Sequence, residues 1–171
     1  GTVLEIGFGS GHNLPYYNIK KIDKIIGLEP SVHMQHLSKK KLKGFNINFE
    51  FLTERAEEIS LESNSIDSVV CTYTLCSISK PEVALSEIRR VLKKNGKFIF
   101  TEHAASPDLK INNFQKKIEP IWKFIADGCH LTRDIRKMLL ENGFNIDNSK
   151  SMYLPKTPKF IGYHIWGLLK K

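Results

Sequence analysis

The chain alternates short apolar runs with longer segments in which apolar residues recur every three or four positions. The apolar runs predict strands at residues 3–6, 22–28, 47–52, 67–73, 98–101, 144–146 and 161–168. The amphipathic segments predict helices at residues 11–17, 31–42, 81–94 and 132–142, whereas residues 104–127 show a less regular pattern. This alternation predicts a single α/β domain built on a doubly wound, mostly parallel sheet.

Capping and turn residues mark several of these boundaries. Ser31 can cap the helix that follows the second strand, and Pro81 suits the first turn of the next one. Asn95 and Gly96 are expected to end that helix, and Gly143 is expected to end the last one.

Three glycines, Gly7, Gly9 and Gly11, directly follow the first predicted strand. Glycine is costly to order, so this spacing indicates a sharp turn against which a ligand lies closely. In doubly wound sheets such a turn lies beside the ligand site, at the carboxyl ends of the strands. Glu29 ends the second strand, where its carboxylate can accept hydrogen bonds from ribose hydroxyls. A nucleotide-like ligand is therefore expected here.

The glycine pattern separates two classes of cofactor. A dinucleotide site would need a third glycine where this chain has His12, and the observed pattern is instead Glu5-x-Gly7-x-Gly9-x-Gly11. In this it resembles the class I S-adenosylmethionine-dependent methyltransferases. Further motifs of that family follow in order at residues 27–31, 65–70 and 91–97. The resemblance implies a Rossmann-like sheet of seven strands with an antiparallel last strand, and methyl transfer that releases S-adenosylhomocysteine.

The resemblance also implies roles for individual residues. Glu5 would help to fix the amino group of the cofactor, the glycines would shape the loop around its methionine part, and Glu29 would bind the ribose. Arg55 stands where many relatives have an acid, which leaves that adenine contact open. The full set of implied cofactor residues is Glu5, Gly7, Phe8, Gly9, Gly11, Glu29, Pro30, Ala56, Glu57, Cys71 and Thr72.

Residues 70–77, 102–103 and 127–133 resemble one subgroup, the methyltransferase-like protein seven group. Its animal members are thiol S-methyltransferases associated with membranes, and bacterial relatives are often labelled as phospholipid or quinone-pathway enzymes. Members of the family normally have one or more helices before the first strand. We therefore expect residues 1–171 to be one methyltransferase domain without its N-terminal helices.

Positioning can supply much of the catalysis, because the sulfonium is already a good methyl donor. His103, just beyond the fifth strand, is the candidate base, with a structural or hydrogen-bonding role as the alternative. Asp127, His130 and Arg133 are candidate contacts to the acceptor. Cys129 and His130 lack the spacing of a zinc site and methyl transfer needs no metal, so no metal is expected. Cys71 and Cys76 are expected to be buried in the core.

The remaining features concern partners and location. The net charge of +8 favours anionic partners, but the basic residues lack the motifs of a nucleic-acid module. We expect a small-molecule acceptor and no nucleic acid. A cytoplasmic protein is expected, and residues 114–125 could lie on an anionic membrane surface as an amphipathic helix. A nicotinamide-dependent oxidoreductase and a non-catalytic cofactor-binding protein are the alternative functions.

Overall fold

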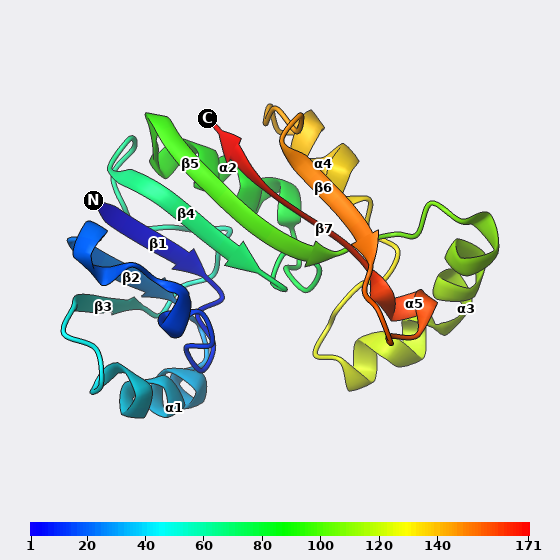
Figure 1. Ribbon diagram of the computed structural model, residues 1–171, viewed down its shortest axis with the longest axis horizontal. Coiled ribbons are helices and arrows are strands. Elements are labelled where there is room, and N and C mark those ends of the chain that lie inside the picture. Colours follow the sequence, from blue (N-terminus) through cyan, green and yellow to red (C-terminus); the bar gives the residue numbers. More distant parts are fainter.

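The computed structural model describes residues 1–171, which form one seven-stranded sheet with five α-helices and two 3₁₀ turns (Figure 1). The strands are β1 (Thr2–Ile6), β2 (Lys24–Leu28), β3 (Asn48–Leu52), β4 (Ile66–Thr72), β5 (Leu92–His103), β6 (Ser149–Tyr153) and β7 (Tyr163–Lys170). The helices are α1 (Val32–Leu42), α2 (Pro81–Val91), α3 (Leu109–Ile125), α4 (Ile135–Glu141) and α5 (Lys159–Gly162), and the 3₁₀ turns are η1 (Leu14–Tyr16) and η2 (Ile19–Lys21).

The strand order is β3-β2-β1-β4-β5-β7-β6. The pairs among β1 to β5 are parallel, and β7 runs antiparallel to both β5 and β6. This confirms the predicted sheet and the antiparallel last strand. The chain order reverses between β1 and β4, because β2 and β3 extend the sheet on one side and β4 and β5 on the other. The carboxyl ends of β1 and β4 therefore flank the point at which such folds bind ligands.

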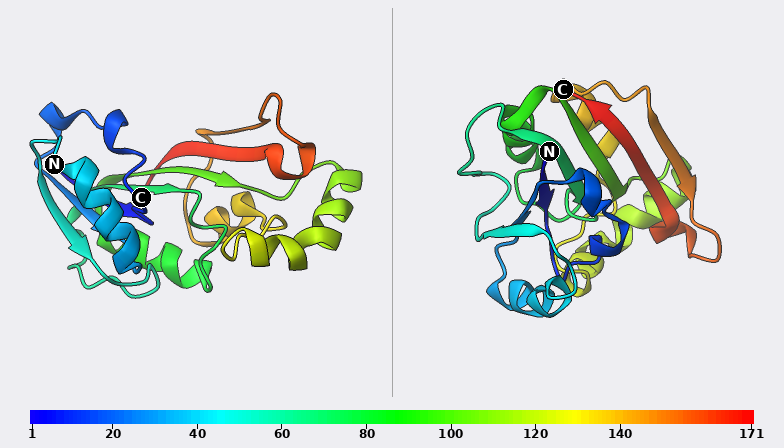
Figure 2. Two further views of the ribbon diagram at one scale, coloured as in Figure 1. Left: turned by 90° about the horizontal axis from the view of Figure 1, so that it is seen from below. Right: turned by 60° about the vertical axis from the view of Figure 1, so that its left-hand side comes forward.

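Alternation along β1 divides the core between the two faces of the sheet. Leu4 and Ile6 belong to a core cluster of 23 buried residues, whereas Val3 packs with Phe8 in a second cluster of five. In the left-hand view of Figure 2, α2 and α4 lie on one side of the sheet and the η1–η2 segment lies on the other.

One predicted helix is wrong, and another is present but ends three residues earlier than predicted. Residues 11–17 do not form a helix and contain only the turn η1, because Gly11 takes a positive φ of +75° and Pro15 begins a tight turn. The helix after β4 ends at Val91, before Asn95 and Gly96. Strand β5 begins at Leu92, and the register between β4 and β5 shifts where residues 93–96 lie.

One further prediction fails in the second half, and the helix considered at residues 114–125 is part of a longer one. Residues 144–146 are not a strand: Phe144 is buried and packs against Phe98 with ring centroids 5.2 Å apart. The strand follows as β6, whose side chains are mostly exposed. Within the irregular segment 104–127 the structure has a helix of 17 residues, α3, which Asp108 caps through hydrogen bonds to two backbone amides.

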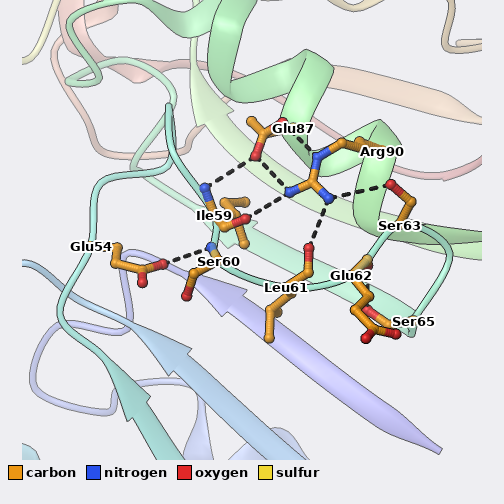
Figure 3. A network of polar contacts seen from close by, with 9 residues as sticks. All are labelled: Glu54, Ile59, Ser60, Leu61, Glu62, Ser63, Ser65, Glu87 and Arg90. Carbon is orange, nitrogen blue, oxygen red and sulfur yellow. Dashed lines mark hydrogen bonds and ion pairs between the residues drawn. The ribbon is translucent and has the colours of Figure 1, made fainter.

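Arg90 on α2 ties down the long connection from β3 to β4 (Figure 3). Its guanidinium donates to the carbonyl oxygens of Ile59 and Leu61, each at 2.7 Å, and forms an ion pair with Glu87. Glu87 in turn accepts from the Ile59 amide at 3.1 Å. The connection held in this way begins beside β3 and carries residues 55–57, which belong to the site described below.

Candidate active site

The loop after β1 is a turn that only small residues fit. Gly7 and Gly9 have φ values of +69° and +54°, and a Cβ on Gly7 would lie 2.3 Å from the Thr74 Oγ1 atom. The Gly7 and Phe8 amides both donate to the Leu28 carbonyl, which joins the loop to the end of β2. A Cβ on Gly9 would instead meet no atom nearer than 3.8 Å, so the space beside Gly9 is open.

Glu29 joins this loop to the next one. Its carboxylate accepts the Gly9 amide at 2.8 Å and the Ser31 amide at 2.9 Å, although only 7% of the residue is exposed. Gln35 supports it from below by donating to the Glu29 carbonyl. A carboxylate has about four lone-pair positions, so two remain for hydroxyl groups of a ligand.

A cavity of about 540 Å³ opens at the carboxyl ends of β1, β2 and β4. Ligand pockets usually have volumes of about 300–1,000 Å³. Six of the predicted cofactor residues line the cavity: Gly7, Gly9, Glu29, Pro30, Ala56 and Glu57. Of the predicted acceptor contacts, Asp127 lines it as well. Residues from four separate loops thus meet around one space.

Glu5 does not line the cavity. Its side chain is buried, and it accepts hydrogen bonds from Asn13 at 2.9 Å and from the Tyr17 hydroxyl at 2.5 Å. Burial raises the pKa of the carboxyl from 4.5 to about 7, against the effect of the two hydrogen bonds. Asn13 also donates to Thr72 at 2.9 Å, so this network links the ends of β1 and β4 behind the glycine loop.

Four other predicted cofactor residues also lie outside the cavity lining. Phe8 packs against Phe49 and Phe51, and Gly11 closes the loop by donating to the Phe8 carbonyl. Thr72 is bound to Asn13, and the Cys71 side chain is fully buried with its thiol 3.6 Å from Glu102. These side chains support the site from behind.

His103 ends β5 next to the cavity, but it is not among the residues that line it. Its Nδ1 atom lies 3.6 Å from the Cys129 sulfur, and its ring packs against both Tyr73 and His164 with centroid distances of 5.0 and 4.6 Å. Tyr73 and His164 also contact each other, with centroids 5.5 Å apart, so the three rings form one cluster. Tyr73 lines the cavity and has a positive φ of 52°, so the candidate base contacts a lining residue without lining the cavity itself.

The other two candidate acceptor residues make structural contacts. His130 Nδ1 is hydrogen-bonded to Glu119 on α3 at 2.9 Å, and Arg133 donates to the Leu75 carbonyl. Asp127 has a positive φ of 47° in the turn that ends α3, and it alone of the three lines the cavity.

Sequence reasoning missed several lining residues. Met34, Tyr73, Thr74 and Ser77 border the cavity, and none of them matches a charged or glycine motif. The position of Tyr73 to Ser77 immediately after β4 was the available indication, since ligands bind beyond the carboxyl ends of the strands.

Glu102 organises the loop that follows β4. Its fully buried carboxylate accepts the amides of Thr74 and Leu75 at 2.9 Å and that of Cys76 at 3.2 Å. Burial raises the pKa of this carboxyl to about 7, against the effect of the amide hydrogen bonds. A carboxylate with three backbone donors is a rigid anchor, and it holds the loop that carries Tyr73 and Ser77 against β5.

Comparison with known families identifies this arrangement. The model of the methyltransferase domain family matches residues 4–100, which run from β1 into β5 and include the strands whose ends border the cavity. The chain is a class I S-adenosylmethionine-dependent methyltransferase. The predicted enzyme class and methyl donor are thereby confirmed in preference to a nicotinamide-dependent oxidoreductase.

Relatives of this methyltransferase extend over almost its whole length. Thiol S-methyltransferase TMT1B of Rattus norvegicus is 36% identical over 170 residues, which are 97% of this chain and 69% of that protein. Thiol S-methyltransferase TMT1A of Homo sapiens is 31% identical over 174 residues, covering 99% of this chain and 70% of its own. The crystal structure of the YcgJ protein of Bacillus subtilis has a TM-score of 0.80 at 16% identity, with 99% and 91% of the two chains covered, which shows the shared fold.

The cavity of this methyltransferase fits S-adenosylmethionine. The open space beside Gly9 admits a ligand against the backbone, and Glu29, which lines the same cavity, can accept further hydrogen bonds. The cavity wall formed by Ala56 and Glu57 continues from this point to the loop after β4. None of the helices has both the length and the apolar character needed to cross a bilayer.

Proposed function

We propose that this methyltransferase acts on a small thiol. Its similarity to thiol S-methyltransferases carries the proposal, because that similarity covers 97–99% of the chain and so includes the segments after β5. Those segments contribute Asp127 to the cavity lining and are where an acceptor would be selected. A likeness confined to the cofactor half would say nothing about the acceptor.

The cavity lining supports the same acceptor. It contains no histidine, lysine or cysteine; its possible proton acceptors are the carboxylates of Glu29, Glu57 and Asp127, and carboxylates are weaker bases than imidazole. His103 packs on Tyr73 and is not a lining residue. An acceptor that ionises unaided near neutral pH suits such a site. Thiols do so, since their pKa is about 8.5 and the thiolate is the nucleophile. Quinol and amine acceptors of the lipid pathways would rely more on a base in the cavity.

The chain's own groups would then act mainly by positioning. Glu29 would accept hydrogen bonds from the ribose hydroxyls, and Gly7 and Gly9 would let the donor lie against the backbone. Tyr73, Ser77 and Asp127 would surround the acceptor. When bound, S-adenosylmethionine supplies an electrophilic methyl group on sulfur. The thiolate would form the new carbon–sulfur bond while the sulfonium bond breaks, with the thiol proton released to water. Holding the reacting atoms in line about 3–3.5 Å apart can supply much of the rate.

Two measurements test this function. Wild-type protein with S-adenosylmethionine is incubated with a small thiol, a quinol or phosphatidylethanolamine, and S-adenosylhomocysteine release is followed. We expect turnover with the thiol, and methylation of the quinol or the lipid alone would refute the proposal.

In parallel, Glu29→Ala is expected to weaken S-adenosylhomocysteine binding about 10- to 100-fold in calorimetric titration. Hydrogen bonds to a charged group contribute about 1.5–3 kcal/mol, and each 1.4 kcal/mol is tenfold in affinity. Glu50→Ala is the control, because that exposed carboxylate on β3 only pairs with Lys24. An unchanged dissociation constant in Glu29→Ala would remove Glu29 from the site.

We further infer that α3 touches an anionic membrane surface. Ile121, Phe124 and Ile125 near its end are 69%, 90% and 68% exposed, and Lys116, Lys117 and Lys123 lie on the same helix. Apolar groups beside lysines match the boundary between acyl chains and anionic headgroups. The helix stands at the far end of the molecule from α1 (Figure 1).

A further inference from the structure

Three ligand-type side chains that are distant in sequence meet beside the cavity. Cys76 lies in the loop after β4, His103 ends β5, and Cys129 follows α3. Their sulfur and imidazole nitrogen atoms all lie within 4.8 Å of one another, and the Cys129 sulfur is 3.6 Å from His103 Nδ1. We propose that Cys76, His103 and Cys129 form a binding site for a Zn²⁺ ion at the acceptor end of the cavity.

The donor set suits zinc. Thiolate sulfur and imidazole nitrogen are its usual ligands, with bond lengths of about 2.3 and 2.0 Å. In a tetrahedral site these lengths separate the donor atoms by about 3.5–3.8 Å, so the present separations need only small side-chain rotations to close. Two thiolates balance the charge of the ion, which limits the cost of burying it. Three protein ligands leave a fourth position for water or another small ligand.

The backbone that carries these ligands is already fixed. The His130 amide donates to the Cys76 carbonyl at 2.9 Å, which joins the loop after β4 to the loop after α3. Glu102 binds the Cys76 amide from β5, next to His103 itself. The Arg133 side chain donates to the Leu75 carbonyl, which ties the same two loops together a second time. A preorganised set of ligands loses little conformational entropy when a metal binds.

The surroundings of the side chains also suit a metal site. Cys76 and Cys129 are 1% and 5% exposed, so water competes little for the ligands. The His103 ring packs against both Tyr73 and His164, which restricts its orientation. Contacts that fix ligand orientation commonly raise metal affinity.

The site would act on the acceptor end of the cavity. Each of its two cysteines is a close chain neighbour of a lining residue, Ser77 after Cys76 and Asp127 before Cys129, and His103 packs on Tyr73. A bound ion would therefore fix the positions of the three side chains proposed to surround the acceptor. The cofactor end, at Gly9 and Glu29, lies in other loops and would be unaffected.

Metal content tests the site directly. Protein purified under reducing conditions is stripped with a chelator, reloaded with Zn²⁺ or Co²⁺, and assayed by elemental analysis and by the visible absorption of thiolate-bound Co²⁺. We expect one ion per chain in the wild type and loss of both readouts in Cys76→Ser, Cys129→Ser and His103→Asn. Circular dichroism verifies that each variant is folded.

Two matched controls keep the result specific. Cys71→Ser changes a cysteine that is equally buried but lies outside the cluster, and His130→Asn changes the histidine beside Cys129 that pairs with Glu119. Both controls should bind one ion. Folded wild-type protein that takes up no Zn²⁺ at micromolar concentrations, or uptake that persists in the cluster variants, would overturn the proposal.

A kinetic comparison tests the role of the ion, and this part rests on the proposed function. Removing Zn²⁺ should raise KM for the thiol about tenfold and leave S-adenosylhomocysteine affinity unchanged. An unchanged KM would overturn that role. If no thiol is methylated but the ion binds as described, the proposed function fails and the metal site stands. If a thiol is methylated but no metal is taken up, the metal site fails and the proposed function stands.

Discussion

Gly7 and Gly9 are both in the left-handed region, yet their surroundings differ. The structure predicts that Gly7→Ala destabilises the protein by more than about 2 kcal/mol, because the new Cβ would lie 2.3 Å from Thr74 Oγ1 in addition to the backbone strain. Gly9→Ala meets no clash and should cost only about 1–2 kcal/mol of strain. Its Cβ would nevertheless occupy space at the cavity, so S-adenosylhomocysteine should bind about tenfold more weakly.

Urea unfolding and calorimetric titration check the two effects separately. Gly44→Ala is the control, since its Cβ has only one ordinary contact, 3.5 Å from the Lys41 carbonyl, and lies outside the cavity. Equal cofactor affinities for Gly9→Ala and the wild type would show that the ligand does not approach the backbone at Gly9.

Glu5 gives a prediction about pH. Burial raises its pKa from 4.5 to about 7, so the folded protein holds this proton more tightly than the unfolded chain does. The stability contribution is therefore complete below pH 4.5 and is lost as the pH rises through about 7. Glu5→Gln cannot ionise, and its free energy of unfolding should exceed that of the wild type by about 3 kcal/mol at about pH 8 and by little below about pH 4.5.

The check is urea denaturation of both proteins across this pH range. Glu50→Gln, at an exposed carboxylate, should follow the wild type. A difference between Glu5→Gln and the wild type that stays constant with pH would contradict the raised pKa.

Predictions from the sequence were most reliable for residue types that have a specific structural role, such as glycine in a sharp turn. The spacing of Gly7 and Gly9 indicated the sharp turn that the structure has there, and the position of Glu29 follows from the end of a buried strand. The same reasoning wrongly began a helix at Gly11, where φ is positive. It could not foresee that Asn13 and Tyr17 would occupy the Glu5 carboxylate, because neither residue belongs to a motif. Such contacts depend on how a loop folds back over the sheet.

The cysteine–histidine group was hidden for a related reason. The separation from Cys76 to His103 exceeds 25 positions, and so does that from His103 to Cys129. No short spacing therefore marks these residues as ligands. They meet only because β4, β5 and α3 all end at one edge of the sheet. The expectation that no metal binds rested on sequence spacing and on the reaction needing no metal, and neither ground could include this convergence.

At the scale of elements, apolar patterns predicted the interior strands and the edge strand β3, but they missed the edge strand β6. Strands β1, β2, β4 and β5 are buried by neighbours, and their apolar runs mark them. The edge strand β6 is largely polar, and the apolar residues just before it serve the core through Phe144. Apolar composition indicates that a segment is buried, and an exposed edge strand such as β6 can pair with its neighbour without being apolar.

The link between α2 and the β3–β4 connection depends on the shape of one side chain. Arg90→Lys should lower the free energy of unfolding by about 1–3 kcal/mol, because a single ammonium cannot reach Glu87 and two carbonyls at once. It should also weaken cofactor binding modestly, since the same connection carries Ala56 and Glu57.

Chemical denaturation measures the first effect and calorimetry the second. The control is Arg89→Lys on the same helix, where the guanidinium donates only to the Asn142 carbonyl at 3.2 Å. If both variants lose equal stability, the network in Figure 3 is not the source of the effect.

At the scale of the whole molecule, charge and exposed apolar surface act together. The chain carries a net charge of +8, which draws it towards anionic lipid, and the end of α3 offers apolar side chains that can enter the bilayer boundary. Long-range attraction alone would vanish at high salt, because the Debye length falls to about 3 Å at 1 M. Binding that uses both contributions should decrease with salt without disappearing.

Vesicle sedimentation separates these contributions. Wild-type protein should bind vesicles that contain anionic lipid and bind zwitterionic vesicles poorly. The double variant Phe124→Ser, Ile125→Ser should bind anionic vesicles about tenfold or more weakly, since burying each side chain contributes about 1.5–3 kcal/mol. Val32→Ser changes an equally exposed apolar residue on α1, at the other end of the molecule, and should bind like the wild type. Equal binding by the double variant would show that charge alone brings the protein to the membrane and that α3 does not insert.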